Sequence, residues 1–186
     1  MTLFKKNEKV RFIAESGVMI ALATILSIIK IYEAPFGGSV TAGSMIPLIL
    51  VGMRWGVLPG VLVGLVYGIL QAVLEPYIVH PVQFLLDYPV AFGMLGLSGL
   101  YRSIKKHKPC SKLMEYIGVL LGIFLAIFGR FTCHVLAGVV FFSDNAGDIN
   151  SWIYSLGYNG SYLSMELLIS VIVIVMIWKP IRREIK

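Results

Sequence analysis

Residues 57–74 read VLPGVLVGLVYGILQAVL, an apolar run without a single charged side chain. A helix needs about 20 such residues to cross the hydrocarbon core of a bilayer, so this stretch predicts a membrane-spanning helix. The rest of the chain has the same character, because 58% of its 186 residues are hydrophobic and only 14% are charged. Soluble domains have roughly 25% charged residues. The composition therefore excludes an ordinary soluble globular protein.

Five further apolar runs lie before and after this stretch. They cover residues 12–31, 45–53, 82–100, much of 113–142 and about 158–178. The run at 45–53 is the weakest, and it reaches membrane length only if 39–44 is also helical or if the helix lies well inside a bundle. The connections are a turn-rich stretch at 32–44, loops at 75–81 and 143–157, and a basic stretch at 101–112. We therefore predict an all-α membrane protein, a single domain of six transmembrane helices over residues 1–186.

The basic residues alternate between the connections. Fourteen of the 16 Lys and Arg residues lie before the first run, between the second and third, between the fourth and fifth, or after the sixth. By the positive-inside rule these segments face the cytoplasm, which places both termini there and the first, third and fifth connections outside. The same segments account for the net charge of +6. We expect a multi-pass protein of the cell membrane, with the lipid bilayer and no nucleic acid as a partner.

Polar side chains inside the apolar runs mark the candidate site, because each one costs several kcal/mol in a bilayer unless it is paired and turned inward. The candidates are Asp87, Arg130, His134, Asn159 and Glu166. One face of the fifth run carries, at intervals of four residues, Arg130, His134, Gly138 and Phe142. Arg130 and Glu166 fall at similar depths, and two interpretations stay open for them: an ion pair beneath the site, or direct contact with a ligand.

Aromatic side chains gather near the outer ends of the same runs and in the outer connections. They are Tyr77, Tyr88, Phe142, Trp152 and Tyr154. An interfacial aromatic belt explains some of them, but it does not explain why they fall near the polar residues Asp87 and His134. A carboxylate among aromatic faces suits a flat, cationic heteroaromatic ligand. The outer connections add acids without compensating bases, which would draw a cation in from outside; these are Glu33, Glu75, Asp144 and Asp148.

Motifs of several enzyme classes are absent from the sequence. It contains no Gly-Lys dipeptide and hence no Walker-type phosphate loop, so the chain does not hydrolyse ATP by that route. Neither a His-Glu-x-x-His nor a Gly-x-Ser-x-Gly motif is present. Cys110 and Cys133 are too few and too differently placed for a disulfide framework or a zinc site, and we expect free thiols. We therefore expect neither an enzyme nor a cofactor or metal.

Four segments have an order and spacing that fit one known family. They are GGS at 37–39 with MIPL at 45–48, HPVQFLLDYPVAF at 80–92, FTCH at 131–134 with Gly138 and Phe142, and Tyr154 with YNG at 158–160. The chain resembles the ThiT family, the thiamine-specific S-components of bacterial energy-coupling factor (ECF) importers. The resemblance covers nearly the whole chain. It implies an S-component bundle with a thiamine pocket near the outer face, closed by the first outer connection.

The resemblance also implies the functional residues. The ligand-binding positions of the family fall on Tyr77, Asp87, Tyr88, His134, Gly138, Phe142, Tyr154 and Asn159. In members where a tryptophan covers the ligand, the matching position is near Gly38, and Phe36 is the aromatic closest to it. The small-residue motif by which the family docks on its transmembrane partner falls on Gly17 and Ala21 in the first helix.

The hypothesis that follows is a subunit that captures thiamine outside and delivers it with an ECF transmembrane scaffold subunit and two ATPase subunits. One alternative is a stand-alone secondary transporter with Glu166 and His134 as a proton relay, although the chain lacks the inverted repeats common in such carriers. An S-component for another vitamin is a second alternative. An intramembrane enzyme that uses Cys133 or His134 is a third.

Overall fold

The computed structural model describes residues 6–102 and 111–182. Its helices are α1 (Lys6–Ile28), α2 (Met45–Trp55), α3 (Val57–Leu74), α4 (Pro81–Leu85), α5 (Ala91–Gly93), α7 (Lys112–Phe141) and α8 (Ser151–Ile181). Two strands, β1 (Lys30–Glu33) and β2 (Ser39–Thr41), form an antiparallel hairpin between α1 and α2. Cys110 and the residues around it lie outside the described part, whereas Cys133 is a buried free thiol.

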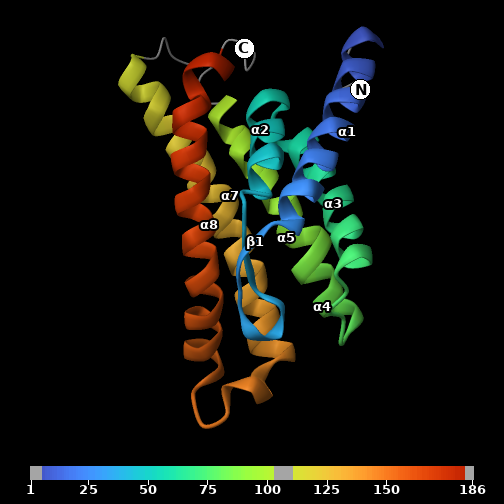
Figure 1. The fold of residues 1–186 in the computed structure, drawn as a ribbon, viewed down its shortest axis with the longest axis vertical. Helices are drawn as coiled ribbons and strands as arrows, with labels where there is room; N and C mark the ends of the chain where they lie inside the picture. The colour runs from blue at the N-terminus through green and yellow to red at the C-terminus, as the bar shows by residue number, and fades with distance from the viewer. Residues whose placement is uncertain (1–5, 103–110, 183–186) are drawn as a thin grey trace.

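The predicted class of all-α membrane protein is confirmed. Within the described ranges, five helical stretches are long and apolar enough to cross a membrane: Asn7–Ile28, Val57–Leu74, Pro81–Arg102, Lys112–Phe141 and Ser151–Ile181. The shorter α2 corresponds to the remaining predicted run. The start of α1 and the end of α8 lie at the same end of the bundle (Figure 1), as an even number of crossings requires. Which side of the membrane this end faces stays a prediction.

The short second run forms a helix inside the bundle. α2 has 11 residues and therefore rises roughly 16 Å, about half of a bilayer core. It is almost wholly buried, and the hairpin continues from it toward the opposite end of the molecule (Figure 1). The alternative of a helix over 39–44 is wrong, because Ser39–Thr41 pairs with Lys30–Glu33. The pairing between the two strands begins at Lys30, a residue that the sequence predicts as part of the first helix.

The fourth span is irregular where it carries the candidate acid. A π-helical turn, Leu86–Val90, joins α4 to α5, and a 3-10 helix, Met94–Gly99, follows. The turn contains Pro89, which has no N–H for the helical ladder. Gly68 of α3 lets this backbone approach closely, because a Cβ at Gly68 would lie 2.7 Å from the Pro89 Cα. Asp87 and Tyr88 are thereby held against α3, in a widened turn of the kind often found at functional sites.

The last helix starts earlier than the sequence predicts. The stretch 143–157 is predicted as a loop, but α8 begins at Ser151, and only a 3-10 helix at Ser143–Ala146 and a short turn precede it. The Asn150 side chain accepts a hydrogen bond from the Trp152 N–H at 2.9 Å, which caps the helix. Tyr154 is therefore fixed on a helix, one turn before Tyr158.

Candidate ligand-binding site

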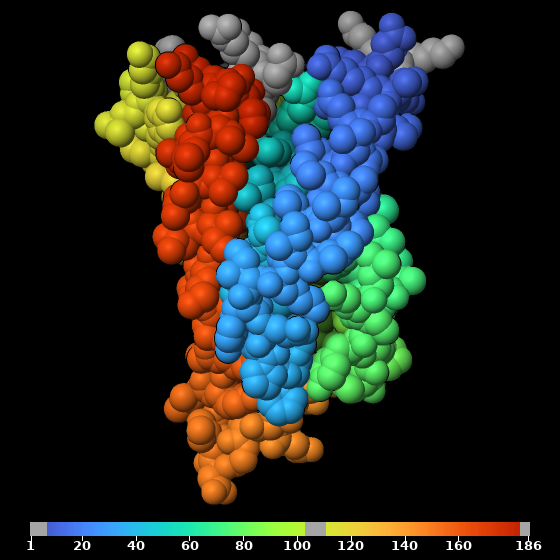
Figure 2. Space-filling view, in the orientation of Figure 1, coloured from blue at the N-terminus to red at the C-terminus, as the bar shows by residue number. Residues whose placement is uncertain are grey.

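A cavity of about 370 Å³ lies between the hairpin, the end of α3, the fourth span, α7 and α8. This volume is within the range of small-molecule sites. Figure 2 shows the hairpin packed over this half of the molecule, between α8 and α3. All eight sequence-predicted ligand-binding residues line the cavity: Tyr77, Asp87, Tyr88, His134, Gly138, Phe142, Tyr154 and Asn159. Phe36 lines it as well.

Asp87 is the centre of a polar chain inside the cavity. Its Oδ1 lies 2.8 Å from the His134 Nδ1, and its Oδ2 accepts a hydrogen bond from the Gln83 side-chain amide at 2.7 Å. The Asp87 side chain is 15% exposed and that of His134 12%. The carboxylate is thus partly withdrawn from water, where its attraction for a cation is stronger than at an open surface. The sequence alone did not indicate a role for Gln83, although it lies one helical turn before Asp87.

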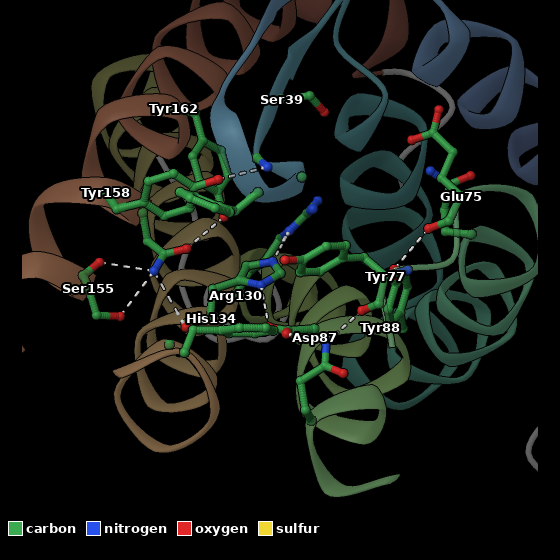
Figure 3. Close-up of a pocket in the computed structure, with 18 of the residues that line it drawn as sticks. Ser39, Glu75, Tyr77, Asp87, Tyr88, Arg130, His134, Ser155, Tyr158 and Tyr162 are labelled. Carbon is green, nitrogen blue, oxygen red and sulfur yellow. Dashed lines mark hydrogen bonds and ion pairs between the residues drawn. The ribbon is translucent and has the colours of Figure 1, made fainter. Parts of the chain in front are cut away.

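Tyr88 fixes the loop that follows α3. Its hydroxyl donates to the Glu75 carbonyl at 2.8 Å and accepts from the Tyr77 N–H at 2.7 Å. The Tyr77 ring in turn stacks on Phe142, with 5.6 Å between centroids. Figure 3 shows Glu75, Tyr77 and Tyr88 on one side of the cavity and Tyr158 and Tyr162 of α8 on the other, with Arg130 and His134 between them. Aromatic side chains therefore line the cavity on two sides.

Asn159 and Gly138 shape the boundary between α7 and α8. The buried Asn159 amide donates to the Ser155 carbonyl at 2.9 Å, and its oxygen accepts from the Tyr162 hydroxyl at 2.7 Å. A Cβ at Gly138 would collide with the Ser155 side chain. Gly138 thus allows α8 to pack closely beside His134. Both residues line the cavity, and direct ligand contact by them stays a prediction.

The hairpin tip is fastened over the cavity by Tyr158. The Tyr158 hydroxyl accepts from the Gly38 N–H at 3.0 Å and donates to the Pro35 carbonyl. Phe36, between these two anchors, has a φ of 64°, in the left-handed region that non-glycine residues rarely adopt. Tyr158 belongs to the YNG segment, but its role could not be predicted from the sequence, because only the fold brings residue 158 to the hairpin.

We expect Tyr158→Phe to weaken ligand retention by the cavity. The change removes one hydroxyl and leaves the Gly38 N–H and the Pro35 carbonyl without that partner. We expect the dissociation rate to rise by about 5- to 30-fold, at roughly 1 kcal/mol for each of the two lost bonds. Stopped-flow fluorescence measures this rate. The matched control is Tyr32→Phe, which removes a hydroxyl from β1 of the same hairpin but outside the cavity lining. Equal rates for the two variants would contradict the role of Tyr158.

The cavity mouth carries an excess of acid. The Lys30 ammonium lies 3.0 Å from Glu33 and 3.1 Å from Glu75, and all three side chains line the cavity. Hydrogen bonds to Glu33 and then to Glu75 raise the pKa of Lys30, so it remains charged at physiological pH. The two carboxylates and the single ammonium together have a net charge of −1, which would attract a cation. The other outer acids, Asp144 and Asp148, are outside the lining.

Arg130 and Glu166 do not form the ion pair that one interpretation proposed. The Glu166 Oε1 accepts from the Thr41 N–H at 2.6 Å and from the Thr41 hydroxyl at 2.7 Å, so this carboxylate anchors the base of the hairpin. Arg130 lines the cavity and packs its guanidinium on the Phe92 ring, 4.0 Å from the centroid. The two charges are near in depth, but each has its own partners in the described part of the chain.

Comparison with known proteins identifies the family. Residues 13–185 match the model of the family described as thiamine transporter protein. The chain belongs to this thiamine transporter family. "Thiamine transporter ThiT" of Bacillus subtilis (strain 168) is 37% identical over 188 residues, which cover 98% of this chain and 97% of that protein. "Thiamine transporter ThiT" of Lacticaseibacillus paracasei is 29% identical over 133 residues, which cover 70% of this chain and 62% of that protein.

A solved structure gives independent support for the fold of this member of the thiamine transporter family. The structure of ThiT from Listeria monocytogenes superposes with a TM-score of 0.83 at 22% identity, and the match covers 96% of this chain and 98% of that one. Membership of the family gives the chain a transport role rather than a catalytic one. With the apolar helices described above, the chain is a multi-pass membrane protein.

Proposed function

We propose that the chain is the thiamine-binding S subunit of an ECF importer, and that thiamine binds in the cavity around Asp87. The observation that carries this proposal is a partly desolvated carboxylate inside a cavity that Tyr77, Phe142 and Tyr158 also line. The mouth of this cavity has an excess of negative charge. Thiamine is a flat, permanently cationic heteroaromatic molecule, which such a site attracts by charge and by stacking. The names of the two curated relatives support the same ligand.

The proposal assigns the energy of transport to other chains. The sequence has no Walker-type phosphate loop, so an ECF transmembrane scaffold subunit and two ATPase subunits would supply ATP hydrolysis. The first helix supports a docking role. Gly17 faces away from the bundle, since a Cβ there would meet nothing within 4 Å, and Ala21 is exposed on the next turn. Small residues at this spacing allow close approach of another membrane helix.

Reconstitution tests the proposal. We expect liposomes that contain only this chain to bind thiamine without accumulating it, with or without ATP, because the sequence has no Walker-type phosphate loop. Addition of the scaffold and the two ATPase subunits should give concentrative, ATP-dependent uptake. Proton-dependent accumulation by the chain alone would instead assign it to the secondary transporters, and binding of a different vitamin with no response to thiamine would overturn the ligand.

A further inference from the structure

A guanidinium lies beside the imidazole of the candidate site. The Arg130 Nε–H donates to the His134 Nε2 at 3.1 Å, from one turn earlier on α7. On its other side the His134 ring meets Asp87, with the Nδ1 at 2.8 Å from the Oδ1. Figure 3 shows the three side chains in one row across the cavity, and all three line it. A cation so close to a site for a cationic ligand calls for a physical reason.

The hydrogen positions follow from the donor inventory. An arginine can only donate, so the His134 Nε2 must present a lone pair. A neutral imidazole carries a single N–H, which is then on Nδ1 and donates to the Asp87 carboxylate. A second proton on Nε2 would replace the Arg130 hydrogen bond with a contact between two cations. The geometry therefore admits only the neutral ring.

We propose that Arg130 is a positioning residue that keeps His134 neutral, so that the charge of Asp87 remains available to a cationic ligand. An imidazolium in this place would form its own ion pair with Asp87 and would have to lose its proton before the ligand could use the carboxylate. The inference rests on the proposed thiamine-binding function. It assigns Arg130 an effect on the protonation of the site, with no contact to the ligand required.

The other charged and titratable groups around the ring do not replace Arg130. Asp87 on the π turn favours a second proton, Tyr162 on α8 approaches with its ring 6.4 Å away, and Cys133 is the neighbour on α7. Tyr67 of α3 and Glu166 of α8 interact with the guanidinium at longer range. Lys30, with Glu33 and Glu75, stays at the mouth, where the three form their own ion pairs. Arg130 is the cation that makes direct contact with His134.

The test compares the pH dependence of thiamine affinity in the wild type and in Arg130→Met between pH 7.5 and 5.5. Met removes both the donor and the charge, so a second proton on the His134 Nε2 no longer meets a cation, and the Asp87 carboxylate 2.8 Å from the Nδ1 favours its uptake. By linkage, the affinity of the variant should then fall by up to about tenfold per pH unit as the solution becomes more acidic. The wild type, run in parallel to account for titration of the ligand itself, should show no such loss.

Two further variants connect the effect to the proposed groups. Arg130→Lys keeps a cation beside the ring, so we expect it to restore most of the wild-type pH profile. Arg130→Met combined with His134→Gln removes the group that takes up the proton, and its affinity, although lower, should no longer respond to acid more than the wild type does. A purely structural role of Arg130 would lower affinity at every pH by the same factor, and such a result would overturn the proposal.

The imidazole ¹⁵N spectrum of the ligand-free chain tests the proposal without thiamine. In the wild type at pH 6 we expect a neutral His134 with the proton on Nδ1, and in Arg130→Met a doubly protonated ring. A wild-type imidazolium at this pH would overturn the inference, even if Arg130→Met did not fold. If these spectra differ as expected but the wild type fails to bind thiamine, the proposed function is wrong while the role of Arg130 stands.

Discussion

Asp87→Asn should lower thiamine affinity by roughly 10- to 150-fold. The variant keeps the size of the side chain but removes the charge, and a charge-assisted interaction is worth about 1.5 to 3 kcal/mol, at 1.4 kcal/mol per tenfold change. The structure adds a second reason. Both carboxylate oxygens accept hydrogen bonds, from His134 and from Gln83, and an asparagine must turn its NH₂ group toward one of these donors. Calorimetric titration of the detergent-solubilised chain measures the loss.

Two controls separate charge from general damage at this site. Asp144→Asn makes the same change in an acid outside the cavity lining, and we expect its thiamine affinity to remain at the wild-type value. A neutral analogue of thiamine should lose less affinity than thiamine does on going from wild type to Asp87→Asn. Equal losses for the two ligands would mean that Asp87 acts through packing, and the charge would have to be balanced elsewhere.

Replacing Gly17 or Ala21 with Trp should abolish uptake in cells and leave thiamine binding by the isolated subunit intact. Both residues face away from the bundle on α1, and the cavity is built from the hairpin and the later helices, so the bulky side chain would block only the approach of a partner helix. Radiolabelled uptake measures the first effect and titration the second.

The matched control for docking is Val73→Trp, which places the same bulk on an exposed position of α3. We expect normal uptake from this variant. Loss of binding together with uptake in the Gly17 and Ala21 variants would show instead that the pair contributes to packing within the subunit.

The spans could be predicted from sequence because bilayer thickness imposes a simple rule on apolar runs. The rule fails for residues 30–55, where a short hairpin and an 11-residue helix together occupy the depth of one span. The hairpin has no alternating apolar pattern, and its order comes from partners far along the chain, Tyr158 and Glu166. Contacts over more than 100 residues leave no local signal at Gly38 or Thr41.

The site was predictable to a different extent. Composition and spacing placed Asp87 and His134 in an aromatic environment, and the resemblance supplied the eight residues that the structure brings to one cavity. The partner of Arg130 was not predictable, because Glu166 lies at the same depth and has the opposite charge. Only the fold shows that the Glu166 Oε1 accepts hydrogen bonds from Thr41 and that Arg130 donates to His134.

The mass of the molecule bound to the purified chain tests the central claim most directly. Native mass spectrometry of the detergent-solubilised protein, prepared with thiamine in the medium, should show one adduct per chain, and the molecule it ejects should have the mass of thiamine. The same preparation of Asp87→Asn should show a much smaller fraction of adduct. An adduct of another mass that excess thiamine cannot displace, or a folded wild type with no adduct in excess thiamine, would contradict the account.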